Sequence, residues 1–210
     1  MAYPVDITVE RALTNRNRLT TAFRFVLAIP HMILVGGATF GFTLWGREGG
    51  LPSIGGEGGL LGAAVYFLAV VSWFTLVLAG THILGIRQLT TFFMRWRVRA
   101  LAYLMLLEDA YPPFGDAPYP ASISIADPPE PRDRVSVAFR VILAIPHLIV
   151  LCFVLLGWCL TTIVAWFAIL FTGAYPAGLY DFGVGTLRWL LRVQAYLLLL
   201  VDAYPPFSFE

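Results

Sequence analysis

The chain has 210 residues, of which 59% are hydrophobic and only 13% are charged, and its net charge is +1. Soluble domains usually carry about 25% charged residues, so this composition favours an integral membrane protein over a soluble one. The 14 basic residues, all arginines, form no stripe interleaved with aromatic residues, so the composition does not indicate a nucleic-acid partner.

The sequence contains the same unit twice. FRFVLAIPH at 23–31 returns as FRVILAIPH at 139–147, which is 116 residues later. DAYPPF at 109–114 returns unchanged at 202–207, which is 93 residues later. Six consecutive identities are far beyond chance, so we predict two tandem repeats.

The two offsets divide the chain into a first repeat, residues 1–115, and a second repeat, residues 116–210. The first repeat holds 23 additional residues, and we predict a Gly-rich insertion at 46–60 that accounts for most of them. Each repeat begins with a short segment of alternating residues, VDITV at 5–9 and SISIA at 122–126, and alternation is typical of strands. We expect these strands to form a small sheet on the cytoplasmic side.

Four segments are apolar over about 20 residues, the length that crosses a bilayer. They are 23–44, 61–84, 137–157 and 159–180. LGWC at 156–159 leaves room only for a tight turn, so we predict that the last two spans form a hairpin. Two spans in each repeat would insert both repeats in the same direction. The expected fold class is therefore an all-α integral membrane protein with short cytoplasmic strands.

The arginines predict the orientation of these spans. Thirteen of the 14 arginines lie in the N-terminal, middle or C-terminal segments or at helix ends that face them, and only Arg47 lies in the opposite loop. Arginine-rich segments remain on the cytoplasmic side of a membrane. We therefore expect a multi-pass protein of the bacterial inner membrane with both termini in the cytoplasm.

Two further segments, 88–108 and 181–201, are apolar but have arginines near their centres. An arginine at the bilayer centre costs about 2.5–3.5 kcal/mol, so we predict interfacial amphipathic helices. The alternative is a third, tilted span in each repeat. In each segment two arginines four residues apart share a helix face, and tryptophan suits the headgroup level. The expected lipid-headgroup contacts are Arg95, Trp96, Arg99, Arg188, Trp189 and Arg192.

The repeated motif places an arginine near the start of a membrane helix. Arg24 and Arg140 can extend to lipid phosphate or pair with a carboxylate. Asp109 and Asp202, which are also repeated, are the candidate partners. A direct role for the arginines in a substrate pathway is the less favoured alternative.

The same motif places a proline and a histidine inside each helix. Pro30 and Pro146 each leave one backbone carbonyl without its usual partner. The residues that follow, His31 and His147, can donate to that carbonyl or to the other repeat, because a buried imidazole needs bonded nitrogens. The alternatives are axial ligation of a haem or chlorophyll metal and a proton relay. We expect no cofactor and no metal site.

These motifs carry a resemblance to a known family. RxxLAIPH, an apolar hairpin, YPxGLYDFxxGxLRWxxRVxAY and DxYPPF resemble the bacterial membrane family catalogued as domain of unknown function 4389. The second repeat holds the whole pattern, at 140–147, 175–196 and 202–207. The first repeat departs from it at 81–103, where THILGIRQLTTFFMRWRVRALAY stands in place of the central stretch. The resemblance implies tandem membrane units and brings no activity, cofactor or catalytic residue.

The sequence lacks the motifs of common enzymes, such as GxSxG and HExxH. We therefore expect a non-catalytic scaffold or accessory subunit, whose helices, rich in Phe, Trp and small residues, suit lateral packing. The expected partners are the lipid bilayer and the membrane proteins of a larger inner-membrane complex, with a respiratory or photosynthetic assembly considered first. The alternatives are a lipid- or quinone-binding module and, less favoured, a small transporter.

Overall fold

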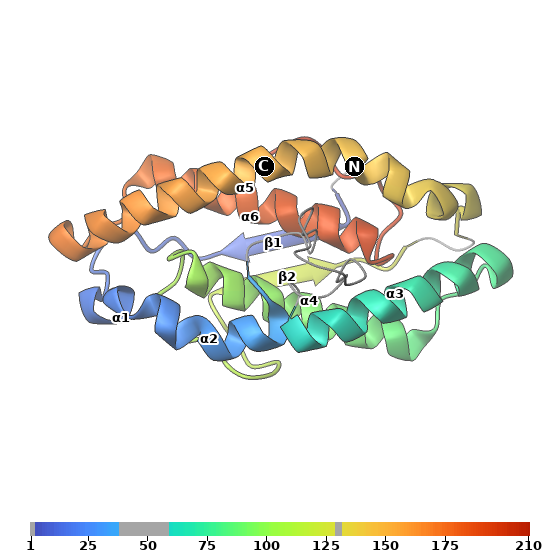
Figure 1. Cartoon of the computed structure of the whole chain (residues 1–210), viewed down its shortest axis with the longest axis horizontal. Helices are drawn as coiled ribbons and strands as arrows, with labels where there is room; N and C mark the ends of the chain where they lie inside the picture. The colour runs from blue at the N-terminus through green and yellow to red at the C-terminus, as the bar shows by residue number, and fades with distance from the viewer. Residues whose placement is uncertain (1–2, 38–58, 129–131) are drawn as a thin grey trace, which may run out of the picture.

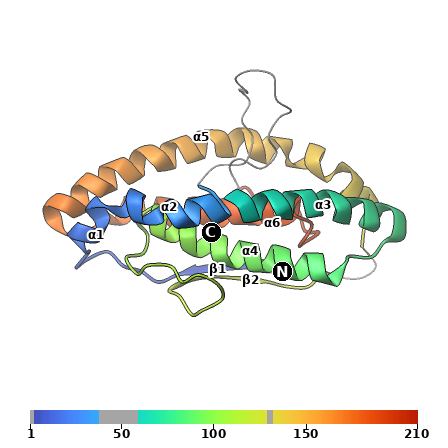
Figure 2. The same ribbon diagram turned by 60° about the horizontal axis from the view of Figure 1, so that its bottom comes forward.

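The computed structural model describes residues 3–37, 59–128 and 132–210. These residues form an elongated, mostly helical molecule with two long helical edges, a pair of helices between them and a two-stranded sheet behind (Figures 1 and 2). The predicted insertion at 46–60 lies outside the described residues up to residue 58.

The two long edges form an outer layer. One edge consists of three consecutive helices, α1 (Arg18–Ala22), α2 (Arg24–Val35) and α3 (Gly59–Ala79). The other edge is the single helix α5 (Arg134–Thr172), which runs antiparallel to them (Figure 1). Asn17 and Asp133 cap the starts of the two edges, because each side chain accepts a hydrogen bond from a backbone amide of the first turn.

The edges meet at both ends of the molecule through tryptophan side chains. Trp73 of α3 donates to the carbonyl of Val137 at 3.0 Å, and Trp166 of α5 donates to the carbonyl of Thr21 at 2.9 Å. The middle layer consists of α4 (Leu84–Leu104) and α6 (Ala177–Leu197).

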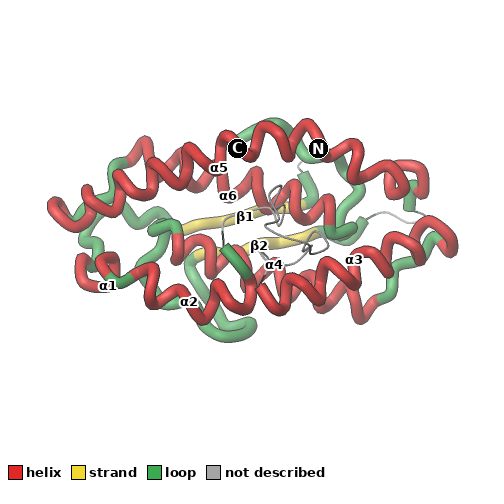
Figure 3. Tube along the Cα trace, viewed as in Figure 1, coloured by secondary structure: helices red, strands yellow, loops and turns green. Residues whose placement is uncertain are grey.

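The third layer is a sheet of two short strands. β1 (Val5–Val9) and β2 (Ala121–Ile125) pair antiparallel, with Val5 opposite Ile125. Figure 3 shows the strands in the centre of the molecule, flanked by α6 and α4. Val5 and Ile7 turn inward, whereas Asp6 and Thr8 face outward, so the alternation seen in the sequence separates a core face from a polar face.

The offsets found in the sequence return in the bounds of the elements. β1 and β2, and the first residues of α1 and α5, are 116 residues apart, whereas α4 and α6, and the last residues of α3 and α5, are 93 residues apart. β1 packs on α6 and β2 packs on α4, so each unit places its strand on the other unit's middle helix. The boundary between residues 115 and 116 remains a prediction.

The predicted hairpin of 137–157 and 159–180 is wrong, because α5 continues through LGWC as one helix of 39 residues. A single glycine inside a helix costs only about 1 kcal/mol relative to alanine, and Gly157 is followed by Trp158, which is fully buried and fixes the helix against the core. Pro146 also lies inside α5, as Pro30 lies inside α2.

The predicted interfacial helices at 88–108 and 181–201 lie inside the protein, and their position relative to a membrane stays a prediction. These segments belong to α4 and α6, whose second halves are almost entirely buried between the outer helices and the strands. Their apolar side chains form the main core, together with Val5, Ile7 and Ile123 of the strands. Among the described helices, α3 and α5 are long and apolar enough to cross a membrane.

Candidate functional site

The repeated polar residues assemble into two matching ion-pair clusters. In the first Arg–Asp cluster, the Asp109 carboxylate accepts hydrogen bonds from Arg16 Nε and Nη2 at 3.0 and 2.8 Å and from Arg24 Nη2 at 2.6 Å. The backbone amide of Asn17 donates to the same carboxylate at 2.9 Å. One aspartate therefore holds the start of α1, the start of α2 and the end of α4 together.

The second Arg–Asp cluster repeats this geometry. Asp202 accepts hydrogen bonds from Arg132 Nε and Nη2 at 2.5 and 2.6 Å and from Arg140 Nη2 at 2.6 Å. The structure thus brings Arg24 to Asp109 and Arg140 to Asp202, as expected for arginines that pair with a carboxylate. The sequence reasoning missed Arg16 and Arg132, although they share the offset of 116 with the rest of the motif.

Backbone carbonyls accept hydrogen bonds from the Nη1 atoms of Arg24 and Arg140. Arg24 Nη1 donates to the carbonyl of Glu108 at 2.5 Å, and Arg140 Nη1 donates to the carbonyls of Tyr196 and Val201 at 3.0 Å. The guanidinium carbons of the two arginines also lie 4.1 Å from the ring centroid of Tyr103 and 4.5 Å from that of Tyr196. These contacts satisfy carbonyls that would be unpaired at the ends of α4 and α6.

The turn after each middle helix contains a leucine with a positive φ angle, 64° at both Leu106 and Leu199. This conformation is costly for a residue with a branched side chain. Arg16 donates to the carbonyl of Leu106 at 2.5 Å, and Arg132 donates to the carbonyl of Leu199 at 3.1 Å. The clusters therefore hold two strained turns as well as the helices.

Electrostatics within the clusters favour the charged aspartates. Burial acts to raise the pKa of Asp109, but the hydrogen bond from Asn17 and the charges of Arg16 and Arg24 outweigh it and hold that pKa below its usual value. The pKa of Asp202 is lowered in the same way, because its two arginine partners outweigh its burial.

Each histidine of the motif lies in an aromatic enclosure. In the first imidazole box, His31 Nδ1 accepts a hydrogen bond from Trp96 Nε1 at 3.0 Å, and the imidazole stacks on Phe114 with ring centroids 4.5 Å apart. Tyr111 completes this box at 5.1 Å. The DAYPPF motif therefore supplies the aspartate of the ion-pair cluster and two rings of the imidazole box.

The second imidazole box has the same arrangement. His147 Nδ1 accepts from Trp189 Nε1 at 3.1 Å, and Phe207 stacks on the imidazole at 3.8 Å. The expected partners, a freed carbonyl or the other repeat, are wrong: each histidine bonds to a tryptophan of its own repeat. An indole N–H only donates, so Nδ1 is the acceptor and a neutral ring carries its proton on Nε2.

This tautomer leaves neither ring nitrogen with a free lone pair for a metal, so the geometry does not favour axial ligation. Within the described ranges, no group of three or more His, Cys, Asp and Glu side chains is placed to hold a metal ion.

The residues expected at lipid headgroups make contacts within the protein, and their contact with lipid stays a prediction. Trp96 and Trp189 are buried and donate to the histidines. Arg95 and Arg99 both pair with Asp116, at 3.0 and 2.8 Å. In the second half, the Nε of Arg188 donates to the carbonyl of Ile7, and Arg192 donates to the carbonyl of Glu210 and lies over the ring of Tyr3. These arginines join the middle helices to the loop before β2, to β1 and to the C-terminal residue.

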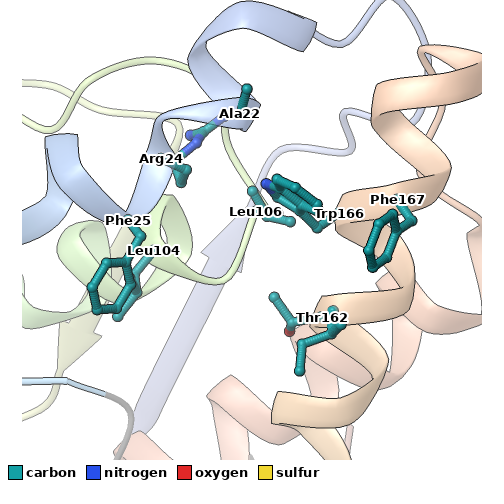
Figure 4. A pocket seen from close by; sticks show the side chains of 9 residues that line it. Ala22, Arg24, Phe25, Leu104, Leu106, Thr162, Trp166 and Phe167 are labelled. Carbon is teal, nitrogen blue, oxygen red and sulfur yellow. The ribbon is translucent and has the colours of Figure 1, made fainter.

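A pocket of about 420 Å³ lies between the start of α2, the end of α4 and the C-terminal half of α5. Figure 4 shows Trp166 and Phe167 of α5 on one side and Phe25 and Leu104 on the other. Its walls are apolar except for Thr162 and Arg24, whose buried Nε has no hydrogen-bond partner within the described part of the chain. The lining residues are Ala22, Arg24, Phe25, Leu104, Leu106, Thr162, Ile163, Trp166 and Phe167.

One protein-family model matches the chain in two segments, residues 58–115 and 134–208, which together cover more than half of it. The chain belongs to the family described as Domain of unknown function (DUF4389). The two matched segments are consistent with two tandem copies of the DUF4389 domain. No curated protein and no solved structure matches the chain.

The DUF4389 matches can be placed on the clusters. The second match contains Arg140, His147, Trp189 and Asp202, and so holds a complete set of motif residues. The first match contains the partners on α4 and in the first DAYPPF, but Arg24 and His31 lie before it. They occupy the same geometry as their counterparts in the second DUF4389 match.

Proposed function

We propose that this protein is a non-catalytic membrane scaffold or accessory subunit that packs in a larger complex of the bacterial inner membrane. The observation that carries the proposal is the apolar outer surface of α2, α3 and α5. Large apolar side chains are exposed there from end to end, including Phe25, Phe67, Phe153 and Phe167, each about half exposed or more. So large an apolar surface is typical of contact with lipid or another membrane protein.

The internal use of the polar motif supports a structural role. The aspartates and the arginines of the two clusters bond to one another and to the backbone, and the histidines bond to tryptophans. A catalytic group needs an open path to a substrate, whereas these groups join helices. Arg188, which donates to the carbonyl of Ile7 in β1, and Arg192, which donates to the carbonyl of Glu210, support a cytoplasmic location for the strand layer and the chain ends.

Site-specific photocrosslinking in native membranes tests the proposal. A photoreactive amino acid at Phe153, on the outer face of α5, should crosslink to one or a few integral membrane proteins in stoichiometric yield. The same probe at Thr8, on the polar face of β1, is the matched control and should not capture them. Lipid adducts alone at Phe153, with a purified species of one chain by native mass spectrometry, would overturn the accessory-subunit proposal.

The pocket beside Arg24 favours a second candidate, a lipid- or quinone-binding module. Its volume suits an acyl chain or a prenyl tail, and the Arg24 Nε could donate to the oxygen of a carbonyl or carboxylate head. We propose that such a molecule enters between α2 and α5.

Ile163→Trp would fill this pocket from the α5 side. Val70→Trp is the matched control, because Val70 lies 93 residues earlier on α3 and is similarly exposed. Organic extracts of the purified proteins, quantified by mass spectrometry, should show a bound lipid or quinone that Ile163→Trp loses at least tenfold and Val70→Trp retains. Equal content in both variants would contradict the pocket as its site.

A further inference from the structure

The length of α5 conflicts with a simple crossing of the bilayer. A helix of 39 residues is about 58 Å long at 1.5 Å per residue, whereas the hydrocarbon core is about 30 Å thick. The opposite edge, α1 to α3, extends alongside it over the same distance (Figure 1). Neither edge can stand upright in a bilayer without a large part of it leaving the hydrocarbon.

The exposed face of α5 is apolar along this whole length. Its exposed stripe includes Val135 near the first turn, Phe139, Phe153 and Phe167, and it ends at Phe171 in the last turn. The polar residues Arg140 and His147 are on the opposite face of the helix. Arg140 is buried in the second Arg–Asp cluster and His147 in the second imidazole box. A helix at the surface of a soluble protein has the reverse arrangement, with its apolar stripe inside.

The opposite side of the molecule is polar at the centre of its long axis. β1 and β2 expose Asp6, Thr8, Ser122 and Ser124, and they lie beside the centre of the long axis rather than at one end (Figure 3). An upright α5 would therefore place the polar strand face at bilayer depth, where unsatisfied polar groups cost roughly several kcal/mol each. Only one orientation immerses the apolar face and keeps the strands in water.

We infer that the protein is monotopic: α1 to α3 and α5 lie parallel to the membrane plane, with their outer face in one leaflet, and no described helix crosses. This inference rests on the proposed membrane residence and replaces the four crossings expected from the sequence. Interfacial helices immerse their apolar face by about 5–10 Å, which this geometry allows along both edges at once. The middle layer then lies at the headgroup level, with the strands facing the cytoplasm.

Depth measurements with spin labels test this inference. In the full chain with Cys152→Ser and Cys159→Ser, a nitroxide is attached in turn at Phe139→Cys, Phe153→Cys and Phe167→Cys. The protein is placed in vesicles of phosphatidylethanolamine and phosphatidylglycerol, and the depth is read from oxygen and nickel-chelate accessibility. A label at Thr8→Cys is the water-exposed control.

The monotopic arrangement predicts similar shallow depths, within a few Å, for all three labels on α5. A straight crossing separates positions 139 and 153 by about 21 Å, and a hairpin at 156–159 places 153 in the far leaflet. Either pattern would overturn the inference. Flotation of the vesicles separates the two proposals, since protein that fails to float refutes membrane residence itself, whereas protein that floats with unequal depths refutes only the in-plane orientation.

The native cysteines give an independent measurement, because both are exposed on α5 and flank Gly157. In intact and in inverted membrane vesicles, a bilayer-impermeant maleimide should label neither Cys152 nor Cys159, because the reactive thiolate does not form in an apolar surrounding, and it should label both after denaturation in sodium dodecyl sulfate. Labelling of Cys159 from the side opposite the termini would restore the hairpin.

Discussion

The two outer edges of the molecule perform the same task with different backbones. α5 is continuous, whereas the equivalent edge is interrupted between α2, which ends at Val35, and α3, which begins at Gly59. The 23 additional residues of the first repeat enter at this break, and Gly59 lies against the backbone of Leu34, so that α3 starts where α2 ends. The fold tolerates the insertion because α2 and α3 still lie end to end along one edge, as the corresponding parts of α5 do along the other (Figure 1).

The middle layer shows how the break is stabilised. Arg97 of α4 is fully buried and donates to the carbonyls of Val35 and Gly37 at the open end of α2. The position 93 residues later is Leu190, which is also fully buried and packs in the core beneath the continuous α5. A cation is therefore present where helix carbonyls are unpaired, and a leucine is present where the helix bonds to itself.

The largest expected effect comes from removing the feature that the two halves share. Asp109→Ala and Asp202→Ala each leave two buried arginines without a carboxylate, and breaking a buried ion pair costs about 3–5 kcal/mol. Thermal unfolding of the purified protein in dodecyl maltoside should show similar losses for both variants. The milder variants Asp109→Asn and Asp202→Asn keep part of the hydrogen bonding, so they should lie between the alanine variants and the wild type. A large loss in one half only would contradict the equivalence of the clusters.

The second effect is confined to the first half. Arg97→Leu makes α4 resemble α6 but leaves carbonyls of Val35 and Gly37 unpaired, and each buried unsatisfied group costs about 1–3 kcal/mol. We expect a clear fall in unfolding temperature. Leu190→Met, a volume-conserving change at the matched position, should cost less than about 1.5 kcal/mol. If Arg97→Leu were neutral, Arg97 would not stabilise the break.

The sequence was sufficient for some of these features because they are local or repeated. Alternation at 5–9 and 122–126 predicts the strands, and the repeated Asp109 is a predicted partner of Arg24, beside the alternative of lipid phosphate. The offset of 116 would also have shown Arg16 and Arg132, had every repeated arginine been compared.

Other features depend on contacts between distant segments. If each span is given the length of one bilayer crossing, the apolar residues of α5 divide into two spans. The predicted turn at Gly157 is wrong because no helix-breaking residue stands next to this glycine. The bond from Trp96 to His31 joins residues 65 positions apart, and no local pattern reveals which partner a buried imidazole takes. The role of Arg97 depends on an open helix end that only the three-dimensional structure places beside it.

A pH titration should distinguish the two halves by a smaller effect. Burial, which outweighs the charge of Arg16, raises the pKa of Glu108 from 4.5 to about 7, and Val201 stands at the matched position. A carboxyl group with a raised pKa contributes most to stability below pH 4.5, and the stability falls as the pH rises to 7, by about 3 kcal/mol.

Glu108→Gln should remove this slope between pH 4.5 and 7 in unfolding experiments. Asp109 and Asp202 act in the opposite sense, because a lowered pKa stabilises above the ordinary value near 3.8 and is lost in stronger acid. A slope that persists in Glu108→Gln would assign it to another group.

The smallest effect concerns the imidazole boxes and needs a double-mutant cycle. His31→Phe leaves the Trp96 N–H buried without an acceptor, which costs about 1–3 kcal/mol, whereas replacing both partners of a hydrogen bond with apolar groups can be nearly neutral. The double variant His31→Phe/Trp96→Phe should therefore be more stable than the sum of the single variants predicts. The cycle with His147 and Trp189 should give a coupling within about 0.5 kcal/mol of the first, because both imidazoles accept the same bond and stack on the same kind of ring. Unequal couplings would mean that the break between α2 and α3, only four residues beyond His31, weakens the first box despite Arg97.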